Sequence, residues 1–110
     1  MRGFVAQHPV TLLYKGARTL IAAPDRPVAY NTTGHPGMAT GGVGDVLTGV
    51  CAALMARGLA PYDAACAGSW LIGHAAEQAL LPDRAAEGLT AGDVARHLPQ
   101  ALNNLRLGAY

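Results

Sequence analysis

The stretch that decides the fold is NTTGHPGMATGGVGD, residues 31–45. Five glycines fall among its first fourteen positions, so it cannot bury a regular apolar face. An amphipathic pattern begins at its end and predicts a helix over Asp45–Arg57, stopped by Gly58 at the C′ position. The predicted apolar face of this helix is formed by Val46, Leu47, Val50 and Leu54.

Three short strands are predicted upstream of this stretch. Val10–Tyr14 is an apolar run that we expect to be covered on both faces. Thr19–Ala22 should return antiparallel, and Val28–Tyr30 should follow a turn over residues 24–27 that is rich in proline and charge. The N-terminal third therefore predicts a strand followed by a small meander.

Two more helices are predicted downstream. Pro61 suits the first turn of a helix that runs to about Leu81, before Pro82. Its narrow stripe of small apolar residues consists of Ala64, Gly68, Leu71, Ala75 and Ala79. Thr90 and Asp93 have the spacing of a capping box for the last helix. We expect Pro99 to kink or restart that helix, whose predicted buried face is Val94, Leu98, Leu102 and Leu105.

The composition of the chain limits its class. Its 110 residues fit one domain or one piece of a larger domain, and 51% apolar against 14% charged residues excludes a disordered chain. A net charge of +1 gives no electrostatic argument for nucleic acid or an acidic membrane surface, and neither partner is expected. The sequence has no apolar run of about 18 residues and no secretory signal. Cys51 and Cys66 are interpreted as reduced thiols of a cytoplasmic protein.

The glycine-rich turn carries the chemical signal. Backbone N–H groups of Gly42, Val43 and Gly44 would lie at a helix N-terminus, where glycines let the backbone approach phosphate oxygens closely. Asp45 either stabilises the helix dipole or accepts a proton from a hydroxyl that attacks a phosphoryl group. Lys15, the only lysine, is either a surface residue or a phosphate contact, and His35 lies inside the turn.

Other site classes find no support in the sequence. GxxxxGK[ST] is absent, and no GxGxxG follows a strand at the spacing of a dinucleotide fold. The four histidines match no zinc pattern. His74 falls on a predicted helix and is interpreted as structural or solvent-facing. No protein metal site is therefore predicted.

Residues 31–49 resemble the signature of the ADP/ATP-dependent NAD(P)H-hydrate dehydratases, which belong to the ribokinase-like superfamily. Three flanking segments also resemble this family: Leu13–Thr19, Gly58–Ala65 and Gly88–Asp93. The chain departs from the family pattern at three positions: His35 replaces Asn, Val43 replaces Thr, and Ile72 replaces His. The family's Gly-Pro-Gly-rich loop and His-Pro-Gly-Glu segment do not occur, so the chain resembles only the C-terminal portion.

The resemblance implies an α/β fold in which residues 1–110 form a single partial domain. This domain would be the C-terminal part of a ribokinase-like three-layer fold, a meander followed by three helices. The implied activity is the return of (S)-NAD(P)H hydrate to NAD(P)H at the expense of ADP, or of ATP in some members, with Mg²⁺ on the nucleotide. Asp45 would be the base, and Asp45 and His35 would contact the hydrate. The anion hole would be Gly42, Val43 and Gly44, and the nucleotide would be held by Lys15, Gly16, Ala17, Arg18, Thr19 and Gly44.

Two alternatives stay open at this point. One is a ribokinase-like kinase of another small alcohol, and the other is a non-catalytic fragment that binds nucleotide. Because an unpaired apolar strand edge promotes association, we also expect the chain to form a homo-oligomer or to associate with the N-terminal half that it lacks.

Overall fold

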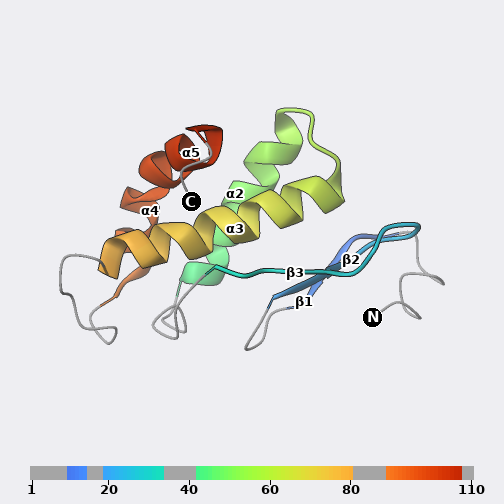
Figure 1. The fold of residues 1–110 in the computed structure, drawn as a ribbon, viewed down its shortest axis with the longest axis horizontal. Helices are drawn as coiled ribbons and strands as arrows, with labels where there is room; N and C mark the ends of the chain where they lie inside the picture. The colour runs from blue at the N-terminus through green and yellow to red at the C-terminus, as the bar shows by residue number, and fades with distance from the viewer. Residues whose placement is uncertain (1–9, 15–18, 34–41, 81–88, 108–110) are drawn as a thin grey trace.

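The computed structural model describes residues 10–14, 19–33, 42–80 and 89–107 (Figure 1). Lys15–Arg18 and His35 lie outside the described residues. In chain order the elements are β1 (Leu12–Tyr14), β2 (Leu20–Ala22), β3 (Ala29–Tyr30), α2 (Val43–Ala56), α3 (Pro61–Leu80), α4 (Ala91–Arg96) and α5 (Leu98–Leu107). The predicted α/β class is confirmed, with a small antiparallel sheet followed by helices. The three-layer arrangement of a complete domain stays a prediction.

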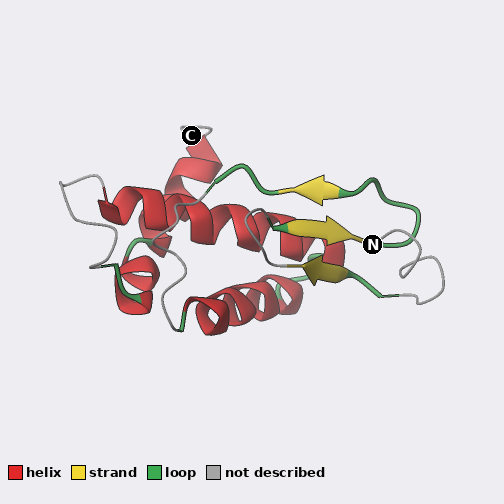
Figure 2. Ribbon diagram, turned by 90° about the horizontal axis from the view of Figure 1, so that it is seen from below, coloured by secondary structure: helices red, strands yellow, loops and turns green. Residues whose placement is uncertain are grey.

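The sheet is an antiparallel meander in the order β1-β2-β3, as predicted, and Figure 2 shows its three strands side by side. The expectation that the first strand is covered on both faces is wrong for the described residues. Leu12 and Leu13 are half-buried, and Tyr14 is 60% exposed. The covered strand is β2, where Ile21 is 1% exposed, because this central strand packs against α3.

Helix α2 begins two residues before its predicted start. Gly42 has a φ of 92°, in the left-handed region that glycine adopts at low cost, and this turns the chain directly into the helix at Val43. On the predicted apolar face, Leu47 is buried and the other three members are half-buried. Gly58 ends the helical segment with a φ of 104°, as predicted.

Helix α3 is the centre of the helical core. All five members of its predicted small-residue stripe are buried. The helix contacts α2, α4 and α5, and its small residues allow a close approach to α2. At Gly68 an added Cβ would lie 2.8 Å from the Cys51 sulfur, so a larger residue would push the two helices apart.

The predicted last helix is two helices in the structure, so the described residues contain four helices after the meander and not three. The capping box is confirmed: Thr90 Oγ1 accepts from the Asp93 amide at 3.1 Å, and the Thr90 amide donates to Asp93 Oδ2 at 3.0 Å. The chain turns at His97 and restarts as α5, since Pro99 has no N–H to continue α4. This restart changes the buried face.

The buried face of the last segment therefore differs from the prediction. Val94 is fully buried as expected, but Leu102 is 42% exposed, and Ala101 is buried in its place. Leu98 and Leu105 are half-buried against the core. A continuous helix would keep one phase from Val94 to Leu105, and the turn between α4 and α5 breaks that phase.

Candidate functional site

Among the described residues, no side-chain hydrogen bond caps the N-terminus of α2. Its first i to i−4 hydrogen bond runs from the Val46 amide to the Gly42 carbonyl at 3.1 Å. The amides of Val43, Gly44 and Asp45 precede this bond, and no described side chain caps the helix. Such N–H groups, together with the positive end of the helix dipole, suit phosphate oxygens.

Asp45 lies in this first turn with an exposed side chain. Nearby, the Thr48 hydroxyl donates to the Gly44 carbonyl at 2.9 Å. Asp45 is the acidic residue of the first turn of α2, and its exposed carboxylate is accessible to a substrate hydroxyl. A general base requires such access.

The structure brings Gly42, Val43, Gly44 and Asp45 together in one helical turn, as the sequence predicted. Val43 is 4% exposed, so its side chain belongs to the core and only its amide can face an anion. The position therefore offers the same backbone donor whether its side chain is Val or Thr. Whether these groups bind a nucleotide stays a prediction.

Thr19 is the described residue of the predicted nucleotide-binding segment. It lies directly before β2, half-buried, and its carbonyl accepts from the Asn31 amide at 2.9 Å. Asn31 is itself bonded to α3, as its side-chain nitrogen lies 2.9 Å from the Ser69 carbonyl oxygen. No role for Asn31 was predicted, because a side-chain bond across 38 residues leaves no local pattern.

The first residue of α4 packs against the turn at the start of α2. A Cβ added to Gly42 would lie 3.1 Å from the Ala91 Cβ, so the turn packs closely against the first residue of α4. This contact was not predicted from the sequence. The α4 N-terminus has its own capping box, whereas that of α2 does not.

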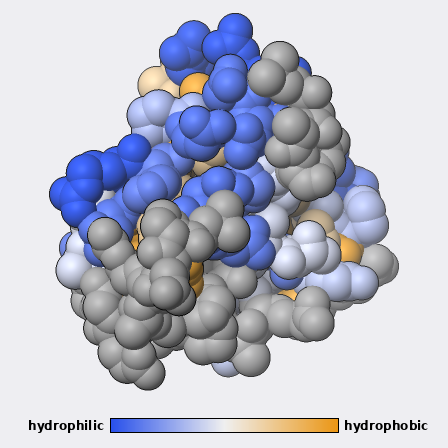
Figure 3. Space-filling view, turned by 60° about the vertical axis from the view of Figure 1, so that its left-hand side comes forward, coloured by the Kyte–Doolittle hydropathy of each residue, from blue (hydrophilic) through white to orange (hydrophobic). Residues whose placement is uncertain are grey.

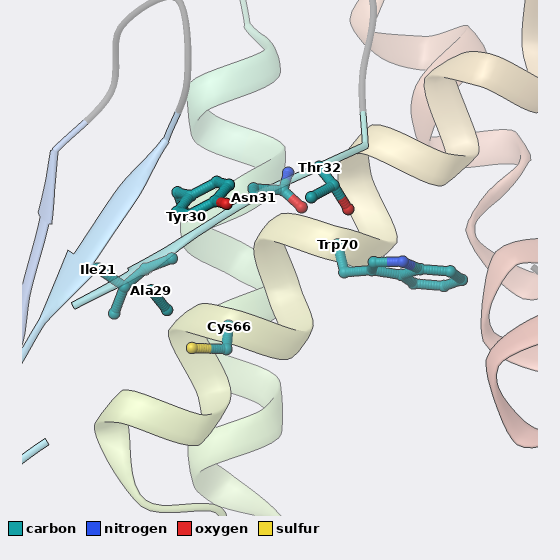
Figure 4. Close-up of a pocket in the computed structure, with 7 residues that line it drawn as sticks. All are labelled: Ile21, Ala29, Tyr30, Asn31, Thr32, Cys66 and Trp70. Carbon is teal, nitrogen blue, oxygen red and sulfur yellow. The ribbon is translucent and has the colours of Figure 1, made fainter. Parts of the chain in front are cut away.

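A separate cavity of about 140 Å³ lies between the sheet and α3 (Figure 4). Its lining is Ile21, Ala29, Tyr30, Asn31, Thr32, Cys66 and Trp70. It includes none of the residues predicted to bind nucleotide or hydrate. Ligand pockets usually measure about 300–1,000 Å³, so this space is too small for a nucleotide.

Both cysteines are free thiols, as predicted. Burial raises the pKa of the Cys51 thiol, and that of Cys66 is raised for the same reason, although a hydrogen bond with Tyr62 acts in the opposite direction. Thiols with a raised pKa are poor nucleophiles and metal ligands. Both cysteines are half-buried, and neither is expected to act as a nucleophile.

The described histidines have structural contacts. His74 is 7% exposed and stacks on Trp70, with ring centroids 4.6 Å apart. Its Nε2 lies 2.9 Å from Asn104 Nδ2, which ties α3 to α5. His97 Nδ1 lies 2.8 Å from the Asp93 carbonyl oxygen. Among the described residues, no three His, Cys, Asp or Glu side chains gather in a group suited to a metal ion.

Neither do the described helices include a membrane-spanning segment, since none of them is both long and apolar enough. On the face drawn in Figure 3, hydrophilic side chains predominate among the coloured residues, and hydrophobic ones show as small separate spots.

Comparison with known proteins identifies the relatives of this chain. The family model for NAD(P)H-hydrate dehydratase matches residues 1–100. A bifunctional NAD(P)H-hydrate repair enzyme of Moorella thermoacetica is 47% identical over 102 residues, covering 93% of this chain and 19% of the relative. An ADP-dependent (S)-NAD(P)H-hydrate dehydratase of Neisseria meningitidis is 45% identical over 85 residues, covering 77% of this chain and 29% of the relative.

The fold has a solved counterpart. The ADP/ATP-dependent NAD(P)H-hydrate dehydratase of Bacillus subtilis, co-crystallised with ATP and Mg²⁺, superposes with a TM-score of 0.85 and 30% identity. The match covers 94% of this chain but only 37% of the Bacillus chain. The chain thus spans about a fifth to three tenths of the length of these two curated relatives and under two fifths of this solved structure.

Proposed function

Since this chain belongs to the NAD(P)H-hydrate dehydratase family, we propose that it takes part in the ADP-dependent return of (S)-NAD(P)H hydrate to NAD(P)H. The observation that carries this proposal is the turn at the start of α2. It combines open backbone amides, a left-handed Gly42 and the exposed carboxylate of Asp45. Phosphoryl transfer to a hydroxyl needs these two kinds of group side by side.

The proposed reaction has two steps. Asp45 removes the proton of the hydrate hydroxyl, whose oxygen attacks the terminal phosphorus of ADP and releases AMP. The ring nitrogen lone pair then expels inorganic phosphate, and loss of a ring proton restores the reduced nicotinamide. The sum is hydrate plus ADP giving NAD(P)H, AMP and phosphate, with Asp45 returned to its starting state after the proton leaves. The amides of Gly42, Val43 and Gly44 stabilise the phosphate charge during transfer.

The nucleotide is assigned to the segment that ends at Thr19. In this proposal Lys15, Gly16, Ala17, Arg18 and Thr19 hold the nucleotide, Gly44 contacts its phosphates, and His35 contacts the hydrate. Because the donors of the α2 turn are backbone N–H groups, they suit phosphate oxygens and not a cation. Mg²⁺ is therefore assigned to the nucleotide phosphates, whose charge it would reduce.

We further propose that residues 1–110 are a single partial domain that works with the rest of a longer polypeptide or as a homo-oligomer. The short coverage of the relatives supports this proposal, as does the position of the half-buried β1 at the edge of the described sheet. Sedimentation would test it, and a stable monomer with full turnover would contradict it.

The two free thiols support a cytoplasmic location.

The deciding experiment places residues 1–110 in the longer polypeptide or oligomer proposed above, adds NADH hydrate, ADP and Mg²⁺, and follows the absorbance of the reduced nicotinamide ring. We expect recovery of NADH together with equal amounts of AMP and phosphate, and none without nucleotide. A parallel panel of small alcohols separates the alternatives. A phosphorylated alcohol without NADH recovery would indicate a kinase, and nucleotide binding without any turnover would indicate a non-catalytic fragment.

A further inference from the structure

A dense set of hydrogen bonds fastens the end of the sheet to the middle of α3. Asn31 Oδ1 accepts from the Thr33 amide at 3.3 Å, and Asn31 Nδ2 donates to the Thr33 carbonyl at 3.3 Å and to the Ser69 carbonyl at 2.9 Å. The Thr33 hydroxyl lies 3.0 Å from Asn31 Oδ1 and 3.1 Å from the Trp70 carbonyl oxygen, and its one proton is shared between them. The segment is therefore held by its own side chains and by two carbonyls of α3.

Gly73 makes this close approach possible. A Cβ at position 73 would lie 2.1 Å from Thr33 Oγ1 and 2.7 Å from the Thr33 carbonyl carbon, both far below contact distance. The second of these atoms is backbone, so a side-chain rotation cannot relieve the clash. By contrast, a Cβ at Gly49 on α2 would meet nothing within 4 Å. Of these two helix glycines, only Gly73 is required by a neighbouring segment.

The same segment reaches the predicted nucleotide-binding residues. The Asn31 amide donates to the Thr19 carbonyl at 2.9 Å, next to the paired residues Leu20 and Tyr30. On its other side, α3 packs against α2, which carries Asp45 and the open amides. Asn31 thus joins the segment that ends at Thr19 to the helix that supports the phosphate turn.

We propose that Asn31, Thr33 and Gly73 form a positioning lock that sets the nucleotide-binding segment in register with the α2 turn. This inference rests on the proposed function. A nucleotide held near Thr19 must present its terminal phosphate at the α2 amides, in line with the hydroxyl that Asp45 activates. Phosphoryl transfer tolerates little misplacement, and an error of about 1 Å costs roughly 10²-fold in rate. None of the three lock residues needs to touch the substrate.

The kinetic test compares matched pairs of variants in the same longer polypeptide or oligomer in which NADH recovery is measured. Gly73→Ala should lower kcat by roughly 10- to 100-fold, whereas Gly49→Ala should not. Thr33→Val should lower kcat in the same way, Thr33→Ser should restore it, and Thr32→Ala serves as the exposed neighbouring control. Adenosine has no phosphate and would contact only the segment that ends at Thr19, so its affinity should stay unchanged. ADP would contact both this segment and the α2 amides, so its affinity should fall. Loss of folding alone would weaken both ligands together.

Hydrogen exchange at the Asn31 amide supplies a readout that needs no activity. Gly73→Ala should remove the protection of this amide, and Gly49→Ala should keep it. If Gly73→Ala does not fold, Thr33→Val takes its place in both measurements. Lost protection with kcat equal to the controls would overturn the positioning role, and unchanged protection would overturn the lock itself. If the wild-type chain neither binds ADP nor recovers NADH, the proposed function fails, and the exchange measurement alone decides whether the lock exists.

Discussion

The helices and the sheet of this molecule are held in different ways. The ten buried residues of the main apolar core all fall between Val43 and Ala101, in or beside the helices. The sheet meets the helices chiefly through β2 and α3, and polar contacts add to this at two places. One is the Asn31–Thr33 segment. The other is the β2–β3 turn, where the Tyr62 hydroxyl donates to the Pro27 carbonyl at 2.8 Å.

The helical core and the sheet therefore position different parts of the proposed site. Helices that share a core fix the α2 turn and Asp45 by close packing, which resists displacement. The strand that follows Thr19 is held both by packing against α3, with Ile21 and Ala22 each 1% exposed, and by the directional bonds of the Asn31–Thr33 segment. An exposed pair at the β2–β3 turn, Arg26 and Asp63 at 3.7 Å, adds little, since exposed ion pairs contribute about 0–1 kcal/mol. The α2 turn is therefore held by packing within the helical core, whereas the sheet is held on α3 by packing and polar contacts together.

The largest expected effect is a loss of turnover at the start of α2, in the part held by the helical core. Asp45→Asn removes the proposed base but keeps the shape of the side chain, so turnover should fall by about 10²–10⁴-fold. Nucleotide affinity should change far less, because the amides of the turn stay in place. Steady-state rates and calorimetric titration with ADP measure the two quantities. Near-normal turnover would remove Asp45 from the catalytic role.

The helical elements were predictable because their signals are local. The spacing of apolar residues predicted α2 and α3, and Thr90 with Asp93 predicted the cap of α4. The narrow stripe of small residues predicted the face that α3 buries. At Pro99 the sequence allowed either a kink or a restart, and only the structure shows that the restart exposes Leu102.

The connection between the sheet and the helices was not predictable. The bond from Asn31 to Ser69 joins residues 38 positions apart, and Gly73 has the sequence appearance of an ordinary helix glycine. Similarly, the partial exposure of β1 depends on what lies beside it, which no pattern in Val10–Tyr14 reveals. Local sequence specifies the elements, and their relative placement arises from contacts between distant segments.

The next largest effect compares stability in the two parts. Ile72 is 2% exposed in the helical core, and Ile72→Ala should lower the free energy of unfolding by about 2–5 kcal/mol. Tyr14 on β1 is 60% exposed, so Tyr14→Ala should change it by less than about 0.5 kcal/mol. Urea unfolding measures both. An equal loss in the two variants would show that Tyr14 is covered in solution by a second copy or by further chain.

A smaller loss is expected at the cap of α4. Thr90→Ala removes the oxygen that accepts from the Asp93 amide, and this should cost about 1 kcal/mol of unfolding free energy. Thr90→Ser keeps the oxygen and is the matched control. If both variants unfold at the same urea concentration as the wild type, the capping box contributes no stability, and packing alone positions α4.

The rates at which the two cysteines are alkylated would measure how readily the helical core and the sheet open. Cys51 lies in the contact between α2 and α3, with its sulfur 3.7 Å from the Ala64 carbonyl oxygen, whereas Cys66 lines the cavity under the sheet. Because the sheet should open more readily than the helical core, an alkylating reagent should modify Cys66 before Cys51. Peptide mass spectrometry measures the order. The reverse order would mean that the helices separate before the sheet does.

The same thiols predict a dependence on pH. Burial raises the pKa of both thiols, so the folded state keeps its protons to a higher pH than the unfolded state does. Their contribution to stability is complete below the unfolded pKa of about 8.5 and is lost as the pH rises through the folded values. Between about pH 7 and pH 10, the wild type should therefore lose more stability than Cys51→Ala or Cys66→Ala does. An equal loss in all three would contradict this coupling.

The smallest expected effect lies where the two parts meet. Ser69 is 3% exposed, and its hydroxyl has no hydrogen-bond partner among the described residues, while its carbonyl accepts from Asn31. Ser69→Ala removes only the unsatisfied hydroxyl and introduces a stronger helix former, so stability should stay equal or rise by up to about 1 kcal/mol. Asn31→Ala is the matched comparison, because it removes the donor to the same residue and should destabilise the junction. If Ser69→Ala instead lowers the free energy of unfolding as much as Asn31→Ala does, the Ser69 hydroxyl has a partner outside the described residues. The sheet would then be held on α3 by further contacts besides those of Asn31, Thr33 and Gly73.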